Sequence, residues 1–357
     1  MTNNQLSINQ ITTNKAETEE DQDELFEHFS TTVDRGQGLL RIDKYLYTKL
    51  ENTSRARIQT AADNGYVLVN SVAVKSSYRV KPLDKVQIMM PYEPRDVEIT
   101  PENIPLDILF EDADILVVNK PSGLVVHPGH GNYSGTLVNA LAYHLQGTPI
   151  FEDRGDLRAG LVHRIDKNTS GVLVVAKNTL AHSNLAAQFF NHTIQRTYHA
   201  LVWGDFADNE GTIEGNIGRS PKNRLQMAIL EPDNPNGKHA VTHYKVLERL
   251  GYVTLVECKL ETGRTHQIRV HMKHIGHPLF NDERYGGDCI VRGTTFTKYK
   301  QYVANCFEIM PRHGLHALSL GFIHPTSGEF MQFCTQYPVD FAACLDKWRA
   351  YGAGTTE

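Results

Sequence analysis

The stretch that decides the fold of this chain is GLVHRIDKNTSG (residues 160–171), which runs directly into VLVVAK (residues 172–177). The first segment is rich in turn-forming residues, and the second is a β-branched apolar run typical of a buried strand. The stretch therefore predicts a polar loop at the edge of a sheet. This loop presents one acidic side chain, Asp166, between Arg164 and Lys167.

Asp166 has two interpretations. Aspartate is common in turns, where its carboxylate accepts backbone N–H groups. The surroundings favour a catalytic interpretation instead, because Arg164 flanks the carboxylate and residues 167–170 add four more polar side chains to the same loop.

Composition is typical of a globular protein with more than one domain. The chain has 357 residues, of which 40% are hydrophobic and 22% charged, and this length favours two domains and a tail. No apolar run approaches the roughly 20 residues that span a bilayer, and the N-terminus lacks the hydrophobic region of a signal peptide. We therefore expect a cytoplasmic protein. Five cysteines without a paired spacing predict reduced thiols rather than a disulfide framework.

The net charge of −5 argues against a nucleic-acid partner only until its distribution is considered. Residues 1–38 hold eight acidic and two basic side chains, a charge of −6, so the remainder carries +1. Residues 1–37 show weak apolar periodicity and predict a disordered, solubilising tail with one helical turn near residues 24–29. Without this tail, the charge no longer excludes an RNA partner.

Residues 38–90 predict a small folded domain. Apolar side chains recur at helical spacing over residues 39–50, and Ser54 is a suitable N-cap for a second helix. After Gly65 the pattern changes to the alternation of short strands. Nine basic and four acidic side chains between residues 41 and 85 give a local charge of +5, which suits a phosphate backbone.

Three motifs in this domain point to RNA. RIDKYL (residues 41–46), SRARIQ (residues 54–59) and GYVLVN (residues 65–70) together resemble the alpha-L RNA-binding domain named after a small-subunit ribosomal protein. The resemblance implies that Arg55 and Arg57 contact the RNA. On charge alone, these bases could equally be a solvated surface.

Residues 107–352, after a proline-containing linker at residues 91–106, predict a large α+β domain. Apolar patterns predict strands at residues 115–119, 123–127, 171–176, 197–203, 241–248, 252–260, 315–323 and 329–335, and helices at residues 136–145, 179–191, 265–275 and 339–351. Consecutive strands joined by hairpins predict a mixed, mainly antiparallel sheet.

Tyr198, in the predicted strand RTYHALVW (residues 196–203), is a second candidate for the site. Strand alternation places it on the face opposite to Thr197 and His199. A packed core tyrosine is the structural interpretation. The functional interpretation is a ring that stacks on a base and offers a phenol for proton transfer.

A third candidate segment is LETGRTHQIRVH (residues 260–271). Thr262 or Thr265 is expected to cap the helix that follows. Arg264 lies at the entrance of this helix, where a buried guanidinium pairs well with a carboxylate. Arg269 is not on the same helix face, and we expect it to meet phosphate or solvent.

A metal site near this helix is disfavoured. The histidines at positions 266, 271, 274 and 277 suggest ligands, but Gly276 and Pro278 end the helix there. No carboxylate or thiolate stands at ligand spacing.

Taken in order, four segments closely resemble one family. HRIDKNTSGVLVVAKN (residues 163–178), RTYHALVWG (residues 196–204), LETGRTHQIRVHMKHIGHPLFND with RYGG (residues 260–287) and LHALSLGFIHPTSGE (residues 315–329) resemble the RluA/RluD family of ribosomal RNA pseudouridine synthases. The similarity extends over about residues 39–350, and ordered agreement of this kind is far more specific than one short motif.

The resemblance assigns roles residue by residue. It implies that Asp166 is the catalytic aspartate, that Arg264 is its partner, and that Tyr198 stacks on the base and takes part in proton removal at C5. It also places His163, Arg164 and Ile268 on the substrate side of the site.

The implied reaction isomerises uridine to pseudouridine without a cofactor or a metal. The target nucleotide must leave its helix to reach the site, which implies base flipping. Asp166 acts either as a covalent nucleophile or as a base in a glycal route. The expected partner is large-subunit ribosomal RNA or a pre-ribosomal particle, with the chain acting as a monomer. The alternatives are the same chemistry on transfer RNA and a non-catalytic RNA-binding ribosome-assembly factor, and the complete set of Asp166, Tyr198 and Arg264 argues against the latter.

Overall fold

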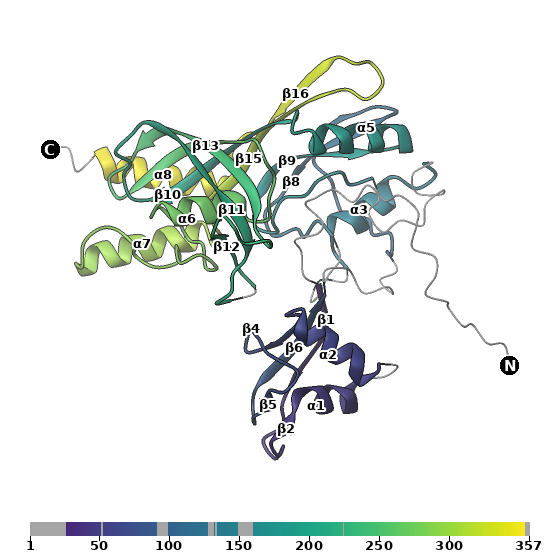
Figure 1. The fold of residues 1–357 in the computed structure, drawn as a ribbon. Helices are drawn as coiled ribbons and strands as arrows, with labels where there is room; N and C mark the ends of the chain where they lie inside the picture. Colours follow the sequence, from purple (N-terminus) through teal and green to yellow (C-terminus); the bar gives the residue numbers. More distant parts are fainter. Residues whose placement is uncertain are drawn as a thin grey trace.

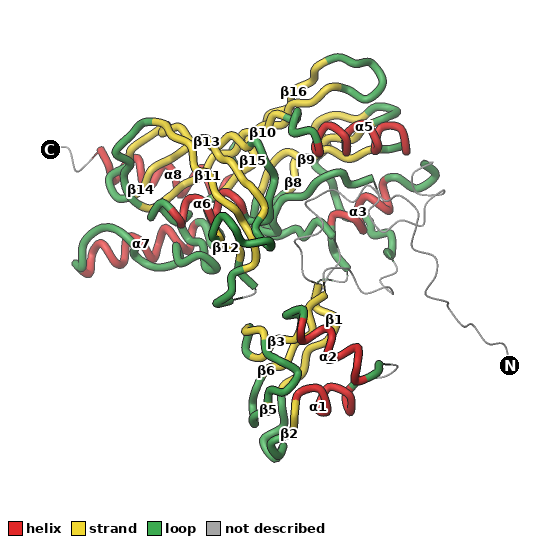
Figure 2. The backbone as a smooth tube through the Cα atoms, in the orientation of Figure 1, coloured by secondary structure: helices red, strands yellow, loops and turns green. Residues whose placement is uncertain are grey.

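The computed structural model of the protein describes residues 26–50, 53–90, 99–127, 132, 134–148, 160–223 and 225–353. These residues form a small N-terminal domain and a large mixed α+β domain (Figures 1 and 2). In the part of the chain so described, no helix is long and apolar enough to cross a membrane.

The small domain packs two helices on a four-stranded sheet with strand order β1-β6-β3-β4. Its elements are β1 (Phe26–Thr32), β2 (Leu40–Arg41), α1 (Ile42–Lys49), α2 (Arg55–Asp63), β3 (Val67–Val69), β4 (Val72–Ala73), β5 (Arg79–Val80) and β6 (Lys85–Met90). The helical spacing of residues 39–50 places Ile42, Tyr45 and Leu46 in the core. Ser54 caps α2 as predicted, because its Oγ accepts the N–H of Arg57 at 3.3 Å.

The N-terminal boundary of this domain differs from the prediction. Residues 26–32, placed by the sequence in a disordered tail with a helical turn near 24–29, form strand β1, which pairs antiparallel with β6. The weak apolar pattern of this segment concealed a strand that is stabilised by a partner about sixty residues later in the chain. The rest of the predicted tail, residues 1–25, lies outside the described residues.

The large domain is built on one ten-stranded sheet with strand order β12-β11-β13-β14-β10-β15-β9-β8-β7, and β16 pairs with β15. Its strands are β7 (Ile108–Glu111), β8 (Ile115–Lys120), β9 (Ser170–Ala176), β10 (Gln195–Trp203), β11 (Glu210–Arg219), β12 (Met227–Leu230), β13 (Lys238–Arg249), β14 (Val253–Leu260), β15 (Leu315–Ile323) and β16 (Phe330–Cys334). Its helices are α3 (Leu137–His144), α5 (Thr179–Phe190), α6 (Gln267–His274), α7 (Thr297–Ile309) and α8 (Val339–Ala353). The predicted mixed, mainly antiparallel sheet is confirmed, since β9 and β15 run parallel and the other paired strands run antiparallel.

Several elements of the large domain depart from the sequence prediction, and strands β7 and β12 are among those not predicted. Residues 123–127, expected to form a strand, lie in turns and loops instead. Strand β11 was not predicted because its sequence, EGTIEGNIGR, has three glycines and low strand propensity; its pairing with β13 over residues 210–217 holds it in the sheet. Helix α7 was also missed, and it packs with α8 against Trp203 and Phe280.

Strand β9 is buried on both faces, which explains its continuous apolar sequence. Val172 and Val174 pack in one core cluster with Leu185 of α5. Leu173 and Val175 face the other way, into a cluster with residues of α3. The segment that carries Asp166 therefore enters a strand that cannot shift without disrupting two cores.

Glycines fix both ends of the loop at residues 160–171, which we call the Asp166 loop. Gly160 has φ +77°, and a Cβ added there would lie 1.9 Å from the carbonyl oxygen of Ala176. Gly171 has φ +123°, and its Cβ would lie 2.0 Å from the carbonyl oxygen of Ala317 in β15. Only glycine allows the loop to leave and rejoin the sheet in direct backbone contact.

Replacing Gly171 with alanine should destabilise the large domain far more than replacing Gly123. Both have a positive φ, but a Cβ at Gly123 would have nothing within 4 Å. We expect Gly123→Ala to lower the free energy of unfolding by about 1 kcal/mol and Gly171→Ala to lower it by about 3 kcal/mol or more. Denaturant titrations of the two variants measure this difference. Equal losses would contradict a steric limit at the β9–β15 contact.

Candidate active site

The guanidinium of Arg269 is buried between two aspartates. Its Nη1 donates to Oδ2 of Asp166 at 2.7 Å, while Nε and Nη2 donate to the two carboxylate oxygens of Asp282 at 2.8 and 2.9 Å. The Asp282 side chain is fully buried, whereas that of Asp166 is 22% exposed. One carboxylate thus anchors the guanidinium, and the other remains open to a ligand.

This arrangement corrects the predicted partner of Asp166. The prediction that Arg269 meets phosphate or solvent is wrong, because Arg269 is only 6% exposed and forms the ion pair with Asp166. Arg264, expected in that role, is half-buried and donates from Nε to the carbonyl of His239 at 3.1 Å. The structure gives the pairing role to Arg269.

The start of α6 explains why spacing misled the prediction. The N-cap is His266, in the left-handed conformation with φ +57°, rather than Thr262 or Thr265. The side chain of Gln267 ties the segment before the helix to its first turn, since its Oε1 accepts hydrogen bonds from Thr262 Oγ1 and from the N–H of Arg264. The left-handed turn at His266 precedes α6, so Arg264 stays outside the helix in the pocket wall, whereas Arg269 lies on the helix and bonds Asp166.

Asp282 was not identified from the sequence. It lies after α6 in the turn NDERYGG (residues 281–287), where Oδ1 also accepts the backbone N–H groups of Arg284 and Tyr285. An aspartate before a glycine-containing turn looks like an ordinary turn residue. Only the fold shows that its carboxylate also holds Arg269.

Two buried basic side chains hold the backbone of the Asp166 loop. Lys120, at the end of β8, donates from Nζ to three backbone carbonyls, including that of Lys167 at 3.0 Å. Arg312 donates from Nη1 to the carbonyl of Asn168 at 3.0 Å and pairs with Asp340 of α8. The backbone on the C-terminal side of Asp166 is therefore fixed by groups from β8 and from the approach to β15.

The charges around Asp166 keep it ionised. Burial by itself raises the pKa of this carboxyl, but the charge and the hydrogen bond of Arg269 outweigh burial and hold the pKa well below its usual range. Near neutral pH the loop therefore presents a carboxylate rather than a carboxylic acid.

A pocket opens over this carboxylate, and several predicted residues border it. Tyr198 lies half-buried on β10, Arg164 half-buried in the loop, and Ile268 buried on α6; all three line the pocket together with Asp166 and Arg264. The structure thus brings together side chains that are about a hundred residues apart in the sequence.

His163 borders the same pocket, but its ring is used inside the protein. Its Nε2 accepts a hydrogen bond from the N–H of Val174 at 3.0 Å, and the ring stacks on Phe189 with centroids 4.5 Å apart. Burial lowers the pKa of His163 to about 3, with Arg196 adding to the effect. His163 thus fastens the loop to β9 and α5, and the substrate contact expected of it stays a prediction.

The predicted RNA contacts of the small domain lie on its surface. Arg55 and Arg57 are both exposed on α2. Arg55 donates from Nη2 to Oδ2 of Asp43 at 2.8 Å, and the Asp43 side chain is fully buried. Arg55 is thus fixed in direction, whereas Arg57 extends from the first turn of the helix that Ser54 caps.

The histidines considered as metal ligands are engaged separately. Nδ1 of His271 is hydrogen-bonded to Thr242, and Nδ1 of His277 to the carbonyl of Trp203. His266 contacts Tyr285.

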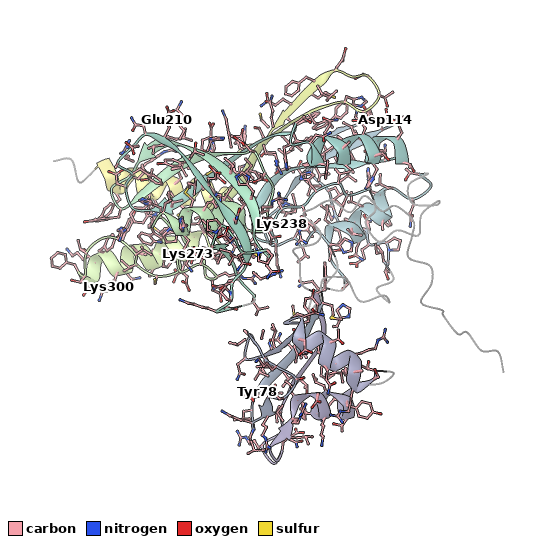
Figure 3. The ribbon with its side chains drawn as sticks, in the orientation of Figure 1. Tyr78, Asp114, Glu210, Lys238, Lys273 and Lys300 are labelled. Atoms are coloured by element: carbon pink, nitrogen blue, oxygen red, sulfur yellow. The ribbon has the colours of Figure 1, made fainter. Side chains whose placement is uncertain are left out.

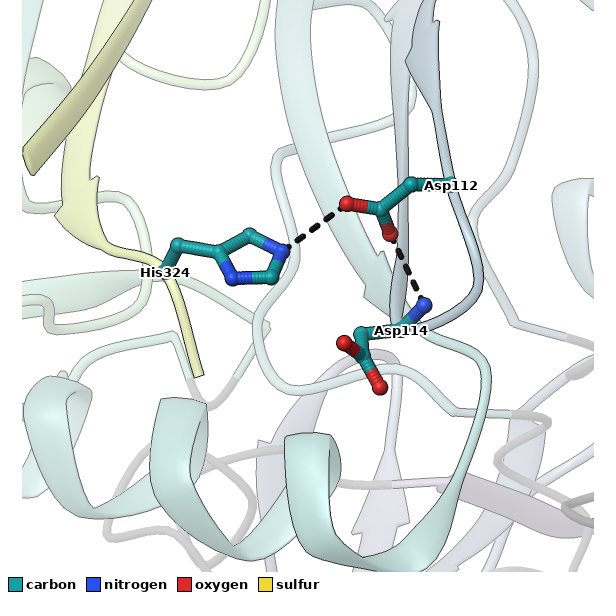
Figure 4. A group of neighbouring side chains, drawn as sticks. All are labelled: Asp112, Asp114 and His324. Atoms are coloured by element: carbon teal, nitrogen blue, oxygen red, sulfur yellow. Dashed lines mark hydrogen bonds and ion pairs between the residues drawn. The ribbon is translucent and has the colours of Figure 1, made fainter. Parts of the chain in front are cut away.

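One cluster with metal-ligand geometry, found among the described residues, lies at a different place (Figure 4). It consists of Asp112, Asp114 and His324. Nδ1 of His324 accepts the N–H groups of Thr326 and Ser327, so its Nε2 carries the proton donated to Asp112. Asp112 also accepts the N–H of Asp114. These bonds join the β7–β8 turn to the β15–β16 turn and use the atoms that a metal would need.

Asp282 should make the stability of the fold depend on pH. Burial raises its pKa, but the hydrogen bonds and charge of Arg269 outweigh burial and lower it below the usual value. Near pH 4 the unfolded chain therefore binds a proton that the folded chain does not, so this contribution is complete above about pH 5 and is lost as the pH falls.

Asp282→Asn should reduce this slope by up to about 1.4 kcal/mol per pH unit. At neutral pH the same change should cost about 3 kcal/mol by breaking a buried ion pair. Unfolding free energies measured between about pH 4 and 7 check both effects. A slope that Asp282→Asn leaves unchanged would refute the contribution.

Each of the two domains matches a known protein family. Residues 114–274 match the RNA pseudouridylate synthase family, and residues 40–86 match the S4 domain. An uncharacterized RNA pseudouridine synthase of Chlorobaculum parvum is 45% identical over 89% of this chain and 96% of its own length. The ribosomal large subunit pseudouridine synthase D of Zymomonas mobilis is 43% identical over 84% of this chain and 91% of its own.

Among solved structures, human RNA pseudouridylate synthase domain containing 1 is 30% identical with a TM-score of 0.50, covering 71% of this chain and 90% of that one. Relatives at this identity, aligned over nearly their whole length, match both the domain with the Asp166 pocket and the small domain. The chain therefore belongs to the RNA pseudouridylate synthase family, as an isomerase that carries an N-terminal S4 domain.

Proposed function

We propose that this chain converts uridines of large-subunit ribosomal RNA to pseudouridine, with Asp166 as the reacting carboxylate. The observation that carries the proposal is the ionised, partly exposed Asp166 held by a buried Arg269 at 2.7 Å. The ribosomal substrate is supported by relatives such as that of Zymomonas mobilis, whose name states large-subunit activity.

The reaction needs little from the protein beyond a carboxylate and a shaped pocket. The bond between N1 of uracil and C1′ of the ribose breaks, and its electron pair leaves with the base. The base turns, C5 bonds to C1′, the proton on C5 is lost, and N1 gains a proton. Asp166 assists either by attacking C1′ or by removing a ribose proton, and an anion suits both routes.

The pocket walls fit a flipped nucleotide. Tyr198 offers an aromatic face on which the uracil can stack, and base–aromatic stacking contributes about 1 to 3 kcal/mol per base. Arg164, in the same pocket, can bind the phosphate of the flipped nucleotide or fill the space that this nucleotide leaves in the RNA helix. Ile268 closes the apolar side, where it is 3% exposed.

Asp166→Asn should abolish pseudouridine formation while leaving RNA binding intact, because the amide keeps the shape of the carboxylate without its charge. We expect a loss of about 10³-fold or more in turnover. Total RNA from a strain lacking the gene, complemented with either the original gene or the Asp166→Asn variant, can be mapped for pseudouridine. Missing sites in large-subunit RNA that only the original gene restores are the expected result.

Two outcomes would contradict this proposal. Missing sites confined to transfer RNA would overturn the ribosomal substrate. Restoration of the sites by the Asp166→Asn variant would overturn the assignment of the carboxylate.

Arg57→Ala should weaken RNA binding in a salt-dependent manner. Loss of one phosphate contact should reduce the slope of log affinity against log salt by about 0.7 to 0.9. Lys300→Ala provides the control, because Lys300 is an exposed base on α7 of the large domain (Figure 3). Binding titrations over a range of salt concentrations measure both variants. Identical slopes for Arg57→Ala and the original protein would remove α2 from the RNA interface.

A further inference from the structure

His266 holds an unusual backbone conformation next to Asp166. Its φ is +57°, and left-handed geometry is uncommon for a residue other than glycine. The ring is mostly buried, with 11% of the side chain exposed, and Nε2 lies 3.8 Å from Oδ2 of Asp166. Residues held in such conformations cluster at functional sites, because the surroundings must enforce them.

Tyr285 determines which nitrogen of His266 carries the proton. Its hydroxyl oxygen accepts the N–H of Met227 at 3.0 Å and lies 2.7 Å from Nδ1 of His266. The Met227 amide donates to the phenol oxygen, and among the described contacts Nδ1 is the acceptor within reach of the phenol proton. A neutral imidazole whose Nδ1 accepts must carry its own proton on Nε2, the atom that faces Asp166.

The surroundings keep both groups in these protonation states. Burial lowers the pKa of His266 to about 3. The negative charge of Asp166 favours a second proton on the His266 ring, but the positive charges of Arg269, Arg284 and Arg219 oppose it. Burial also raises the pKa of Tyr285 to about 12, so the phenol remains a donor.

We propose that His266 is a positioning residue that presents a neutral Nε2–H to Oδ2 of Asp166 and thereby leaves Oδ1 for the substrate. Among the described residues, the contacts from Arg269 and His266 both reach Oδ2. A separation of 3.8 Å is too long for a hydrogen bond, and bonds of this kind tighten when the substrate closes the site. The inference rests on Asp166 being the reacting carboxylate.

A neutral donor suits this role better than a charged one. It fixes the carboxylate in direction but leaves its negative charge available, whereas an imidazolium would add a second neutralising charge beside Arg269. The donor also stays the same across the neutral pH range, so Asp166 meets every substrate in the same orientation.

Two substitutions of His266 separate positioning from folding. Glutamine places its amide nitrogen near the position of Nε2, whereas asparagine reaches only the position of Nδ1. Asparagine, however, tolerates the left-handed backbone better. If His266 were merely structural, His266→Asn would be the more stable and the more active variant.

We expect the opposite order for activity. Single-turnover rates at saturating RNA should fall by about 10²-fold in His266→Asn, because misplacing a reacting group by about 1 Å costs that much. They should be at least partly restored in His266→Gln, with RNA affinity unchanged in both. Rates that follow the thermal stability of the two variants would overturn the proposal.

Nuclear magnetic resonance reads the tautomer directly and does not depend on activity. In the whole enzyme labelled with ¹⁵N-histidine, the signals missing from His266→Asn identify the ring. We expect the pattern of a neutral imidazole protonated at Nε2 throughout the neutral range. A proton on Nδ1, or a charged ring at about pH 6, would overturn the assignment.

Tyr285→Phe tests the origin of the tautomer and retains an aromatic ring, which in the original protein lies 4.9 Å from the guanidinium carbon of Arg269. This variant should lose the Nε2–H pattern and should lower the rate. Combined with His266→Asn it should lower the rate no further, because the two residues act through one contact. Additive losses would contradict this.

If Asp166→Asn were active while the tautomer persisted, the role of Asp166 would fail but the assigned proton position would stand.

Discussion

One guanidinium shared between two carboxylates governs this site. Arg269 joins three segments that are distant in sequence: the loop before β9, helix α6 and the turn at Asp282. A buried cation needs a buried anion, and Asp282 supplies one completely. Because Asp282 already balances the charge of Arg269, the cluster as a whole keeps one negative charge. That charge resides on Asp166, the more exposed of the two carboxylates. A simple pair of Asp166 and Arg269 would be electrically neutral and a weaker nucleophile or base.

Buried basic side chains also hold the backbone of the Asp166 loop. Lys120 and Arg312 place two buried basic side chains against backbone carbonyls of the Asp166 loop, and Asp340 on α8 balances the charge of Arg312. Carbonyls are acceptors that any sequence provides, so the backbone is held independently of the side chains that face the pocket. Lys120 comes from β8 and Arg312 from the segment before β15, and these two strands flank β9 in the sheet. The Asp166 loop leads into β9, which forms with β15 the one parallel strand pair described in the large domain. The position of the carboxylate therefore depends on this pair.

The sequence predicted the features that depend on neighbouring residues. It did not predict the features that depend on contacts between segments distant in the chain. The loop and strand at residues 160–177, the cap at Ser54 and the mixed sheet follow from turn residues, capping chemistry and alternation. Strands β1 and β11 could not be predicted, since their partners β6 and β13 stabilise them more than their own residues do. The partner of Asp166 was misassigned because helical spacing from Thr265 assumes a regular start. The left-handed turn at His266, a conformation that no sequence period reveals, is where α6 begins, after Arg264 and before Arg269.

The histidines around the loop restrict how the proton of C5 can leave. His163, His266 and His313 all border the pockets that open on Asp166, and burial lowers the pKa of each to about 3. An imidazole with so low a pKa is a poor base at neutral pH. His163 and His313 are moreover hydrogen-bonded to Val174 and Thr169 inside the protein. On the proposed mechanism, this leaves Asp166, Tyr198 or water at the exposed side of the pocket as acceptors of the proton. The buried imidazoles thus contribute to the site through fixed hydrogen bonds. The negative charge of the site is set by Arg269 and the two aspartates, whose ionisation does not change near neutral pH.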